Sequence, residues 1–168
     1  GYPTYAVTPA GEFVLDETVV KNVVTSEDGE GNKTYTFEIN NDLKWSDGVK
    51  VTAADFVFGL LFAASPEWAA AGASSQAGRD LVGHTAYKAG ETDTFPGVKL
   101  LDTYKFSLTI AADRLPYFYE LAYVAYGPSP LHVWGQGVEI GEDGSSLTGD
   151  VAAAANYVAT VERFAPTI

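Results

Sequence analysis

Apolar and polar residues alternate strictly along two stretches of the chain, and each alternation predicts a half-buried β-strand. In 33–40 (KTYTFEIN) the aromatic and aliphatic side chains fall on one face, and 104–110 repeats the pattern. A run rich in β-branched residues, 18–25, precedes the first stretch across the turn formers of 27–32, and 98–103 precedes the second. The sequence therefore predicts two antiparallel hairpins.

A helix is predicted between the two hairpins. Thr52 and Asp55 have the spacing of a capping box, in which a hydroxyl and a carboxylate satisfy the free amides of a helix start. The helix should begin at Ala53 and stop before Ser65 and Pro66, because a residue that precedes proline resists the helical conformation. It is apolar on nearly all sides, so we expect it to be buried against the sheet.

Shorter helices are predicted elsewhere. Proline at the first position favours one over 66–71 and another, rich in aromatic residues, over 115–121. A further turn over 130–134 should lie on the core, as should 115–121. The glycine-rich segment 136–149 is predicted to be a flexible loop, and 150–165 a C-terminal helix.

These elements predict one α+β domain over 1–168, an antiparallel sheet built from hairpins with helices packed on it. A chain of this length can bury a core of its own. The apolar run 56–64 is much shorter than the roughly 20 residues that cross a bilayer. The chain begins Gly1-Tyr2-Pro3-Thr4, without methionine or the pattern of a signal peptide, so we expect it to be a fragment of a longer protein.

Composition excludes several functions. With 22 Asp and Glu against 10 Lys and Arg, the net charge of -12 disfavours binding to nucleic acid or anionic lipid. The absence of cysteine rules out disulfides, thiolate metal sites and cysteine nucleophiles. Aromatic residues make up 13% of the chain, which favours recognition over catalysis.

No catalytic or metal-binding motif stands out. His84 and His132 lie far apart without a neighbouring nucleophile or ligand pair, so each is expected to be an ordinary imidazole with one hydrogen bond. The segment 28–32 has acidic residues at alternate positions but lacks the glycine and glutamate that a calcium loop requires. No serine stands in a nucleophile elbow. We expect no enzyme activity, no cofactor and no metal.

Three consecutive segments resemble a known signature. Residues 35–39 (YTFEI), 43–48 (LKWSDG) and 51–58 (VTAADFVF) are similar to the oligopeptide- and dipeptide-binding proteins of ABC importers, the family 5 extracellular solute-binding proteins. The segments 95–102 and 115–121 continue the similarity in family order, and the resemblance covers roughly residues 11–135. Val49-Lys50 and Ala54 depart from the usual pattern without removing the helix cap.

The resemblance implies a place and a function for the chain. It would be the small subdomain of the first lobe of a two-lobed protein that captures peptides or other small solutes outside the cytoplasmic membrane, in the periplasm or as a lipoprotein. Its partners would be the solute and, through the full-length protein, ABC permease subunits, and it would be a monomer. The stretch 65–83 would face the cleft, where Trp68 is the candidate ligand contact; packing a short helix is its other possible role. A surface adhesion domain that binds protein or glycan is the alternative function, and a small hydrolase is a second one.

Overall fold

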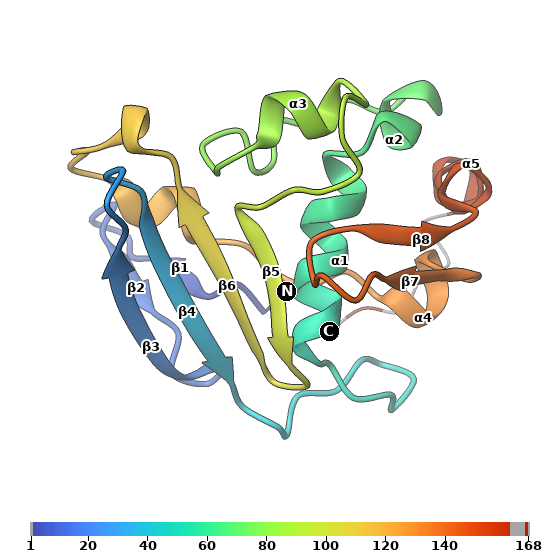
Figure 1. The fold of residues 1–168 in the computed structure, drawn as a ribbon. Helices are drawn as coiled ribbons and strands as arrows, with labels where there is room; N and C mark the ends of the chain where they lie inside the picture. Colours follow the sequence, from blue (N-terminus) through green and yellow to red (C-terminus); the bar gives the residue numbers. More distant parts are fainter. Residues whose placement is uncertain (1, 162–166, 168) are drawn as a thin grey trace.

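Two β-hairpins join side by side to form the main sheet. The computed structural model describes residues 2–161 and 167. The sheet has the order β3-β4-β6-β5, all antiparallel, with the bounds β3 Val20–Glu27, β4 Lys33–Ile39, β5 Val98–Asp102 and β6 Lys105–Ile110. Both predicted hairpins are confirmed, and β4 pairs with β6 between them, with Phe37 opposite Phe106 (Figure 1).

The helix α1 (Ala53–Ala63) crosses one face of this sheet and begins at the predicted residue. The ring of Phe56 stacks on that of Phe106, with 5.0 Å between the centroids. On the opposite side of α1, Phe58 and Phe62 stack on each other at 4.9 Å and belong to a separate hydrophobic cluster. The helix is therefore buried on both sides, as its apolar sequence predicts.

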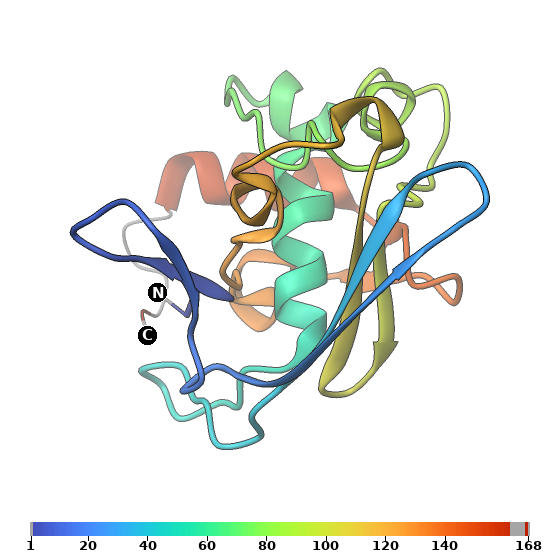
Figure 2. The ribbon, with the colours of Figure 1, turned by 90° about the vertical axis from the view of Figure 1, so that its left-hand side faces the viewer.

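A second layer covers the side of α1 that faces away from the sheet. It consists of α2 Pro66–Ala70, α4 Leu131–Trp134, β7 Val138–Ile140, β8 Leu147–Gly149 and α5 Val151–Val161. Figure 1 shows α1 between the sheet and α5, and in Figure 2, which is viewed from the side of the sheet, α5 passes behind α1. The predictions of α2 and α4 are confirmed. The start of the C-terminal helix is confirmed as well, and residues 162–165 of that prediction lie outside the described part of the chain.

The segment 136–149 is a short hairpin instead of the predicted loop. Its strands β7 and β8 pair antiparallel. The glycines allow close backbone contacts rather than marking a linker: a Cβ at Gly144, where φ is +74°, would lie 2.5 Å from the carbonyl oxygen of Leu100. A Cβ at Gly149 would lie 2.0 Å from the carbonyl oxygen of Gly137.

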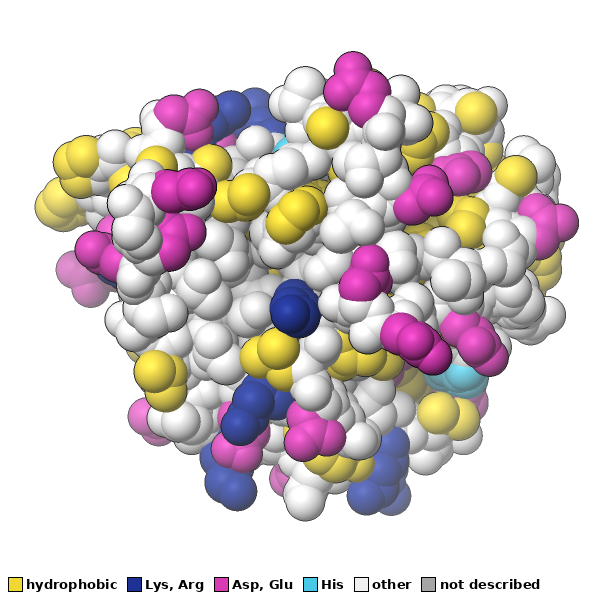
Figure 3. Space-filling model, in the orientation of Figure 1, with side chains coloured by type: hydrophobic (Ala, Val, Ile, Leu, Met, Phe, Trp, Pro, Cys, Tyr) yellow, Lys and Arg dark blue, Asp and Glu magenta, His cyan; other side chains and the backbone are white. Residues whose placement is uncertain are grey.

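The prediction of a core helix over 115–121 is wrong. Leu115, which precedes proline, is extended, and the 3-10 helix η2 (Glu120–Val124) begins only at Glu120. The aromatic side chains between them are exposed, and Phe118 is 90% exposed. They pack on one another: the rings of Phe118 and Tyr119 meet edge to face, with 4.9 Å between their centroids. Figure 3 shows hydrophobic side chains projecting at the upper left, over the segment that follows β6.

The remaining elements are short and are not predicted by the sequence patterns. They are the hairpin of β1 Tyr5–Val7 and β2 Phe13–Leu15, the helix α3 His84–Lys88, and the 3-10 turn η1 Ala112–Arg114. Within the described residues, no helix has the length and apolar character that crossing a membrane requires.

The buried carboxylate of Asp55 joins three parts of the fold. Its Oδ2 atom accepts hydrogen bonds from the amide of Thr52 at 3.0 Å and from the indole of Trp45 at 3.3 Å, and Oδ1 accepts from the amide of Leu131 at 3.1 Å. Burial raises the pKa of Asp55, and these three hydrogen bonds offset only part of that rise. The same side chain thus caps α1 and holds the start of α4.

Asp55→Asn is expected to destabilise the protein by about 2–3 kcal/mol, because an amide cannot accept from three donors without directing its own N–H groups at one of them. Denaturant unfolding followed by circular dichroism measures the change. Asp113→Asn, at an exposed position, is the control and should change the stability by less than about 0.5 kcal/mol. Equal losses in the two variants would contradict this role of Asp55.

Glu120 fixes the 3-10 helix η2 to the sheet. Its Oε2 atom lies 2.8 Å from the ammonium of Lys33 and accepts a hydrogen bond from the hydroxyl of Tyr35. Burial acts to raise the pKa of Glu120, but the hydrogen bonds from Lys33 and Tyr35 outweigh it, so the pKa lies below its ordinary value of 4.5.

A lowered pKa in the folded state means that the ionised carboxylate stabilises the fold at neutral pH and that this contribution is lost as the pH falls through the folded pKa. Glu120→Gln should therefore cost roughly 1 kcal/mol at neutral pH, and the difference from the wild type should shrink between about pH 5 and about pH 3. Urea unfolding across this range tests it, with the exposed Glu91→Gln as the matched control. A difference independent of pH would refute the ionic contribution.

Candidate functional site

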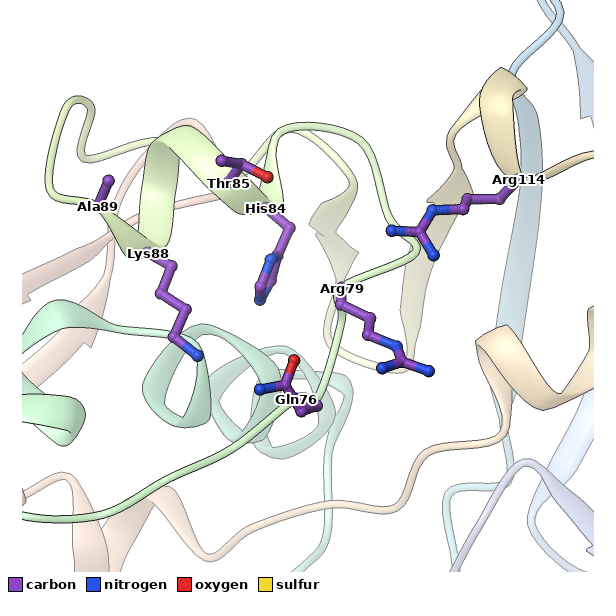
Figure 4. Close-up of a pocket in the computed structure, with 7 residues that line it drawn as sticks. All are labelled: Gln76, Arg79, His84, Thr85, Lys88, Ala89 and Arg114. Atoms are coloured by element: carbon purple, nitrogen blue, oxygen red, sulfur yellow. The ribbon is translucent and has the colours of Figure 1, made fainter.

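An open pocket of about 550 Å³ lies between α3 and η1. Figure 4 shows the side chains that line it, which come from the segment before α3, from α3 itself and from the turn after β6: Gln76, Arg79, His84, Thr85, Lys88, Ala89 and Arg114. Three of the ten Lys and Arg residues of this acidic chain meet here. Elsewhere, acidic side chains are scattered over the face shown in Figure 3.

Among the described residues, one buried carboxylate contacts these cations. Asp80, 7% exposed, accepts from Nη1 of Arg114 at 2.9 Å, and Nε of Arg79 lies 4.0 Å from its other oxygen. The ammonium of Lys88 donates to the carbonyl oxygen of Ser75 at 2.9 Å, which leaves two of its protons for other acceptors. The pocket therefore carries a net positive charge.

His84 forms the inner wall of the pocket and is 8% exposed. Its Nε2 atom is buried and has no hydrogen-bond partner among the described residues. The ring meets that of Phe95 at 5.7 Å, and in Figure 4 it points between Lys88 and Gln76. Burial lowers the pKa of His84 below its ordinary value of 6.5, and the positive charge of Lys88 lowers it further by a smaller amount. The imidazole is therefore neutral at pH 7.

Local features of the sequence hold α3 in place. Gly83 precedes the helix with φ at +85°, and a Cβ there would lie 2.5 Å from Cδ of Pro96, so both conformation and space require glycine. The hydroxyl of Tyr87 donates to the carbonyl oxygen of Leu61 at 2.6 Å and thereby anchors α3 to α1. The pocket is thus built on the most deeply buried helix of the fold.

Trp68, the ligand contact proposed from the sequence, does not line this pocket. Its ring packs on Phe62 at 5.2 Å, and its amide donates to the side chain of Ser65, which caps α2. The side chain is half-buried. The structure therefore places Trp68 in the packing of α2, and contact with a ligand stays a prediction.

The two histidines differ in their surroundings. Nε2 of His132 lies 2.6 Å from the carboxylate of Asp47, and this hydrogen bond lowers the pKa of Asp47. His132 thus has the single hydrogen bond that the sequence predicts, whereas Nε2 of His84 has none among the described residues. The described residues also contain no group of three His, Cys, Asp or Glu side chains arranged to hold a metal ion.

The pocket was not predicted from the sequence as a site. Its residues extend from 76 to 114, and folding alone brings Arg114 to Asp80. The one available signal was the grouping of Arg79, His84 and Lys88 within a short stretch of an acidic chain. Gln76 and Arg79 do fall within 65–83, the stretch expected to face a ligand.

Comparison with known proteins gives the family of this α+β domain. Residues 18–157 match the sequence model of the bacterial extracellular solute-binding proteins, family 5 Middle. The chain belongs to this family, and the α+β fold with an antiparallel sheet is confirmed by its solved members.

Several relatives match over part of their length. The periplasmic oligopeptide-binding protein OppA of Escherichia coli is 34% identical over 108 residues, which are 64% of this chain and 20% of that protein. The probable deoxycholate-binding periplasmic protein YgiS of Escherichia coli is 36% identical over 106 residues, 62% of this chain and 20% of that protein. The structure of Listeria monocytogenes OppA bound to peptide aligns with a TM-score of 0.61 at 22% identity, over 80% of this chain and 26% of that one. The chain thus spans about a fifth of the length of these curated relatives.

His84→Leu is expected to leave the stability unchanged or raise it by about 1 kcal/mol, because leucine has a similar volume and removes a buried nitrogen without a partner. His132→Leu removes the contact with Asp47 and should not increase the stability of the fold. Thermal unfolding of both variants provides the comparison. A loss above about 2 kcal/mol for His84→Leu would show that the imidazole is a structural group.

Proposed function

We propose that the chain is part of the substrate-binding component of an ABC importer, a two-lobed protein that captures oligopeptides, dipeptides or other small solutes outside the cytoplasmic membrane. The chain supplies the small subdomain of the first lobe. It has no catalytic role, and the full-length protein acts as a monomer that delivers its ligand to permease subunits. The match of residues 18–157 to the solute-binding family is the observation that carries this proposal.

The relatives support the class of ligand without fixing it. One curated relative is an oligopeptide-binding protein and another is described as a probable deoxycholate-binding protein, so solutes of different chemistry are bound within the family. Both are periplasmic proteins, which supports a location outside the cytoplasmic membrane, with or without a lipid anchor. The adhesion and hydrolase alternatives have no corresponding observation in their favour.

Trp68 remains a candidate contact within this proposal. It lies in the stretch 65–83 and keeps part of its side chain exposed. If the ring reaches the ligand, Trp68→Ala in the full-length protein should weaken binding by about 1–3 kcal/mol.

A ligand held between two lobes should bind poorly to a single subdomain, because association costs roughly 4–15 kcal/mol before any affinity is gained. The isolated chain should therefore unfold cooperatively as a monomer and bind peptides no more tightly than with a roughly millimolar dissociation constant, and the full-length protein should bind at least about a hundredfold more tightly. Calorimetry of both proteins with a mixed peptide and solute library tests this. Micromolar binding by the isolated chain would mean that it contains a complete site, and absence of binding by the full-length protein would refute the proposed function.

A further inference from the structure

We propose that α3 and His84 form a pH-sensitive device: protonation of the His84 imidazole in mildly acidic solution releases α3 from the rest of the fold and opens the pocket that this helix borders. At neutral pH the imidazole is uncharged and α3 stays packed on the fold. The inference is independent of the proposed function, because it concerns a conformational equilibrium of this chain alone.

The buried nitrogen of His84 has no acceptor for a second proton. The side chain is 8% exposed, and its Nε2 atom is buried without a hydrogen-bond partner among the described residues. A neutral imidazole tolerates this position, because its single proton can reside on Nδ1. An imidazolium has a proton on both nitrogens, so it would bury a charged N–H donor without an acceptor, which is costly in a protein interior.

The charges around the ring also oppose protonation. The charged groups that face it come from three elements: Lys88 from α3, Arg79 and Asp80 from the segment before α3, and Arg114 from η1 (Figure 4). The segment before β5 contributes only the uncharged ring of Phe95. Asp80 attracts an imidazolium, but its Oδ1 atom already accepts from Arg114 at 2.9 Å. Protonation would thus place a fourth positive charge beside three cations and one carboxylate.

The helix α3 is held by few side chains, and His84 is one of them. The helix has five residues, of which only His84 and Tyr87 are buried. The hydroxyl of Tyr87 donates to the carbonyl oxygen of Leu61 at 2.6 Å. A helix this short is unstable without tertiary contacts, so its conformation depends on these two side chains. Expulsion of His84 removes one of them, and α3 can then open locally while the sheet and α1 stay folded.

Proton linkage gives the direction of the pH effect. Burial, and to a smaller extent the charge of Lys88, lowers the pKa of His84 in the folded state below 6.5, whereas an imidazole released to solvent titrates near that value. Between these two pKa values the released form binds a proton that the packed form does not bind. The packed form is therefore most stable above about pH 6.5, and the opening equilibrium of α3 should increase roughly tenfold for each pH unit below it, down to the folded pKa.

Hydrogen exchange of backbone amides measures this equilibrium. The reporters are the amides of Tyr87 and Ala89, which donate to the carbonyl oxygens of Gly83 and Thr85, each at 3.1 Å. In the 168-residue chain, their protection factors, corrected for the intrinsic pH dependence of exchange, should fall roughly tenfold between about pH 6 and about pH 5. The amide of Ile39, which donates to the carbonyl oxygen of Tyr104 at 2.8 Å, is the reference and should keep its protection.

Two pairs of variants test the role of the imidazole. His84→Leu should abolish the pH dependence at the reporter amides, and His132→Leu, outside the pocket, should leave it intact. Lys88→Gln removes a cation that faces the ring, so it should raise the pKa of His84, read from the imidazole resonances by NMR, and reduce the loss of protection. Lys99→Gln, at an exposed position of β5, should change neither quantity.

Three results would overturn the inference. Protection at Tyr87 and Ala89 that does not depend on pH, or that falls equally in His84→Leu, would show that the imidazole does not control α3. An equal fall at Ile39 would show that acid unfolds the whole molecule instead of releasing one helix. Equal effects of Lys88→Gln and Lys99→Gln would also refute it. Solute binding by the full-length protein is a separate measurement, so this test and that of the proposed function can fail independently.

Discussion

The fold depends on a helix that has no polar side to offer to water. Because α1 is apolar all round, one layer cannot bury it, and the chain encloses it between the four-stranded sheet and the second layer of α2, α4, α5 and the β7-β8 hairpin. Phe56 belongs to the core on the sheet side, and Phe58, two residues later, to the core on the other side. The carboxylate of Asp55 then connects the ends of both layers at the start of the helix.

The position of the pocket follows from the same helix. At the end of α1, the side chain of Ser65 caps α2, and the chain returns through 71–83 to α3, which the hydroxyl of Tyr87 ties to the carbonyl oxygen of Leu61. This hydrogen bond ties the backbone of α3, which forms one wall of the pocket, to a buried helix. The polar groups of the site thus lie on a rigid apolar support, an arrangement common to ligand sites.

Most of the framework could be predicted because its signals are local. Alternation over 33–40 and 104–110, and the spacing of Thr52 and Asp55, depend on neighbouring residues only. The exposure of the aromatic residues around Phe118 could not be predicted, since an aromatic run has the same composition in a core as on a surface. The hairpin β7-β8 was missed because its glycines serve close backbone contacts with Leu100 and Gly137, which are remote in the sequence or visible only after folding. The pocket could not be predicted from the sequence for the same reason, because Arg114 and Asp80 are distant in the sequence and come into contact only in the folded chain.

Because both hydrophobic cores share α1, the position of this helix also determines which parts of the molecule can unfold locally. Neither layer can detach without exposing one side of the helix to water, so the amide hydrogens of α1 should exchange with solvent only when the whole molecule unfolds. The hairpin of β1 and β2 joins this unit at one end: Tyr5 is buried in the core on the sheet side, whereas the side chains of Val7 and Val14 are about half exposed. The amides at the exposed end of the hairpin can therefore exchange through local opening while Tyr5 and the rest of the core stay folded. The protein thus combines one cooperative unit centred on α1 with a hairpin end that opens on its own.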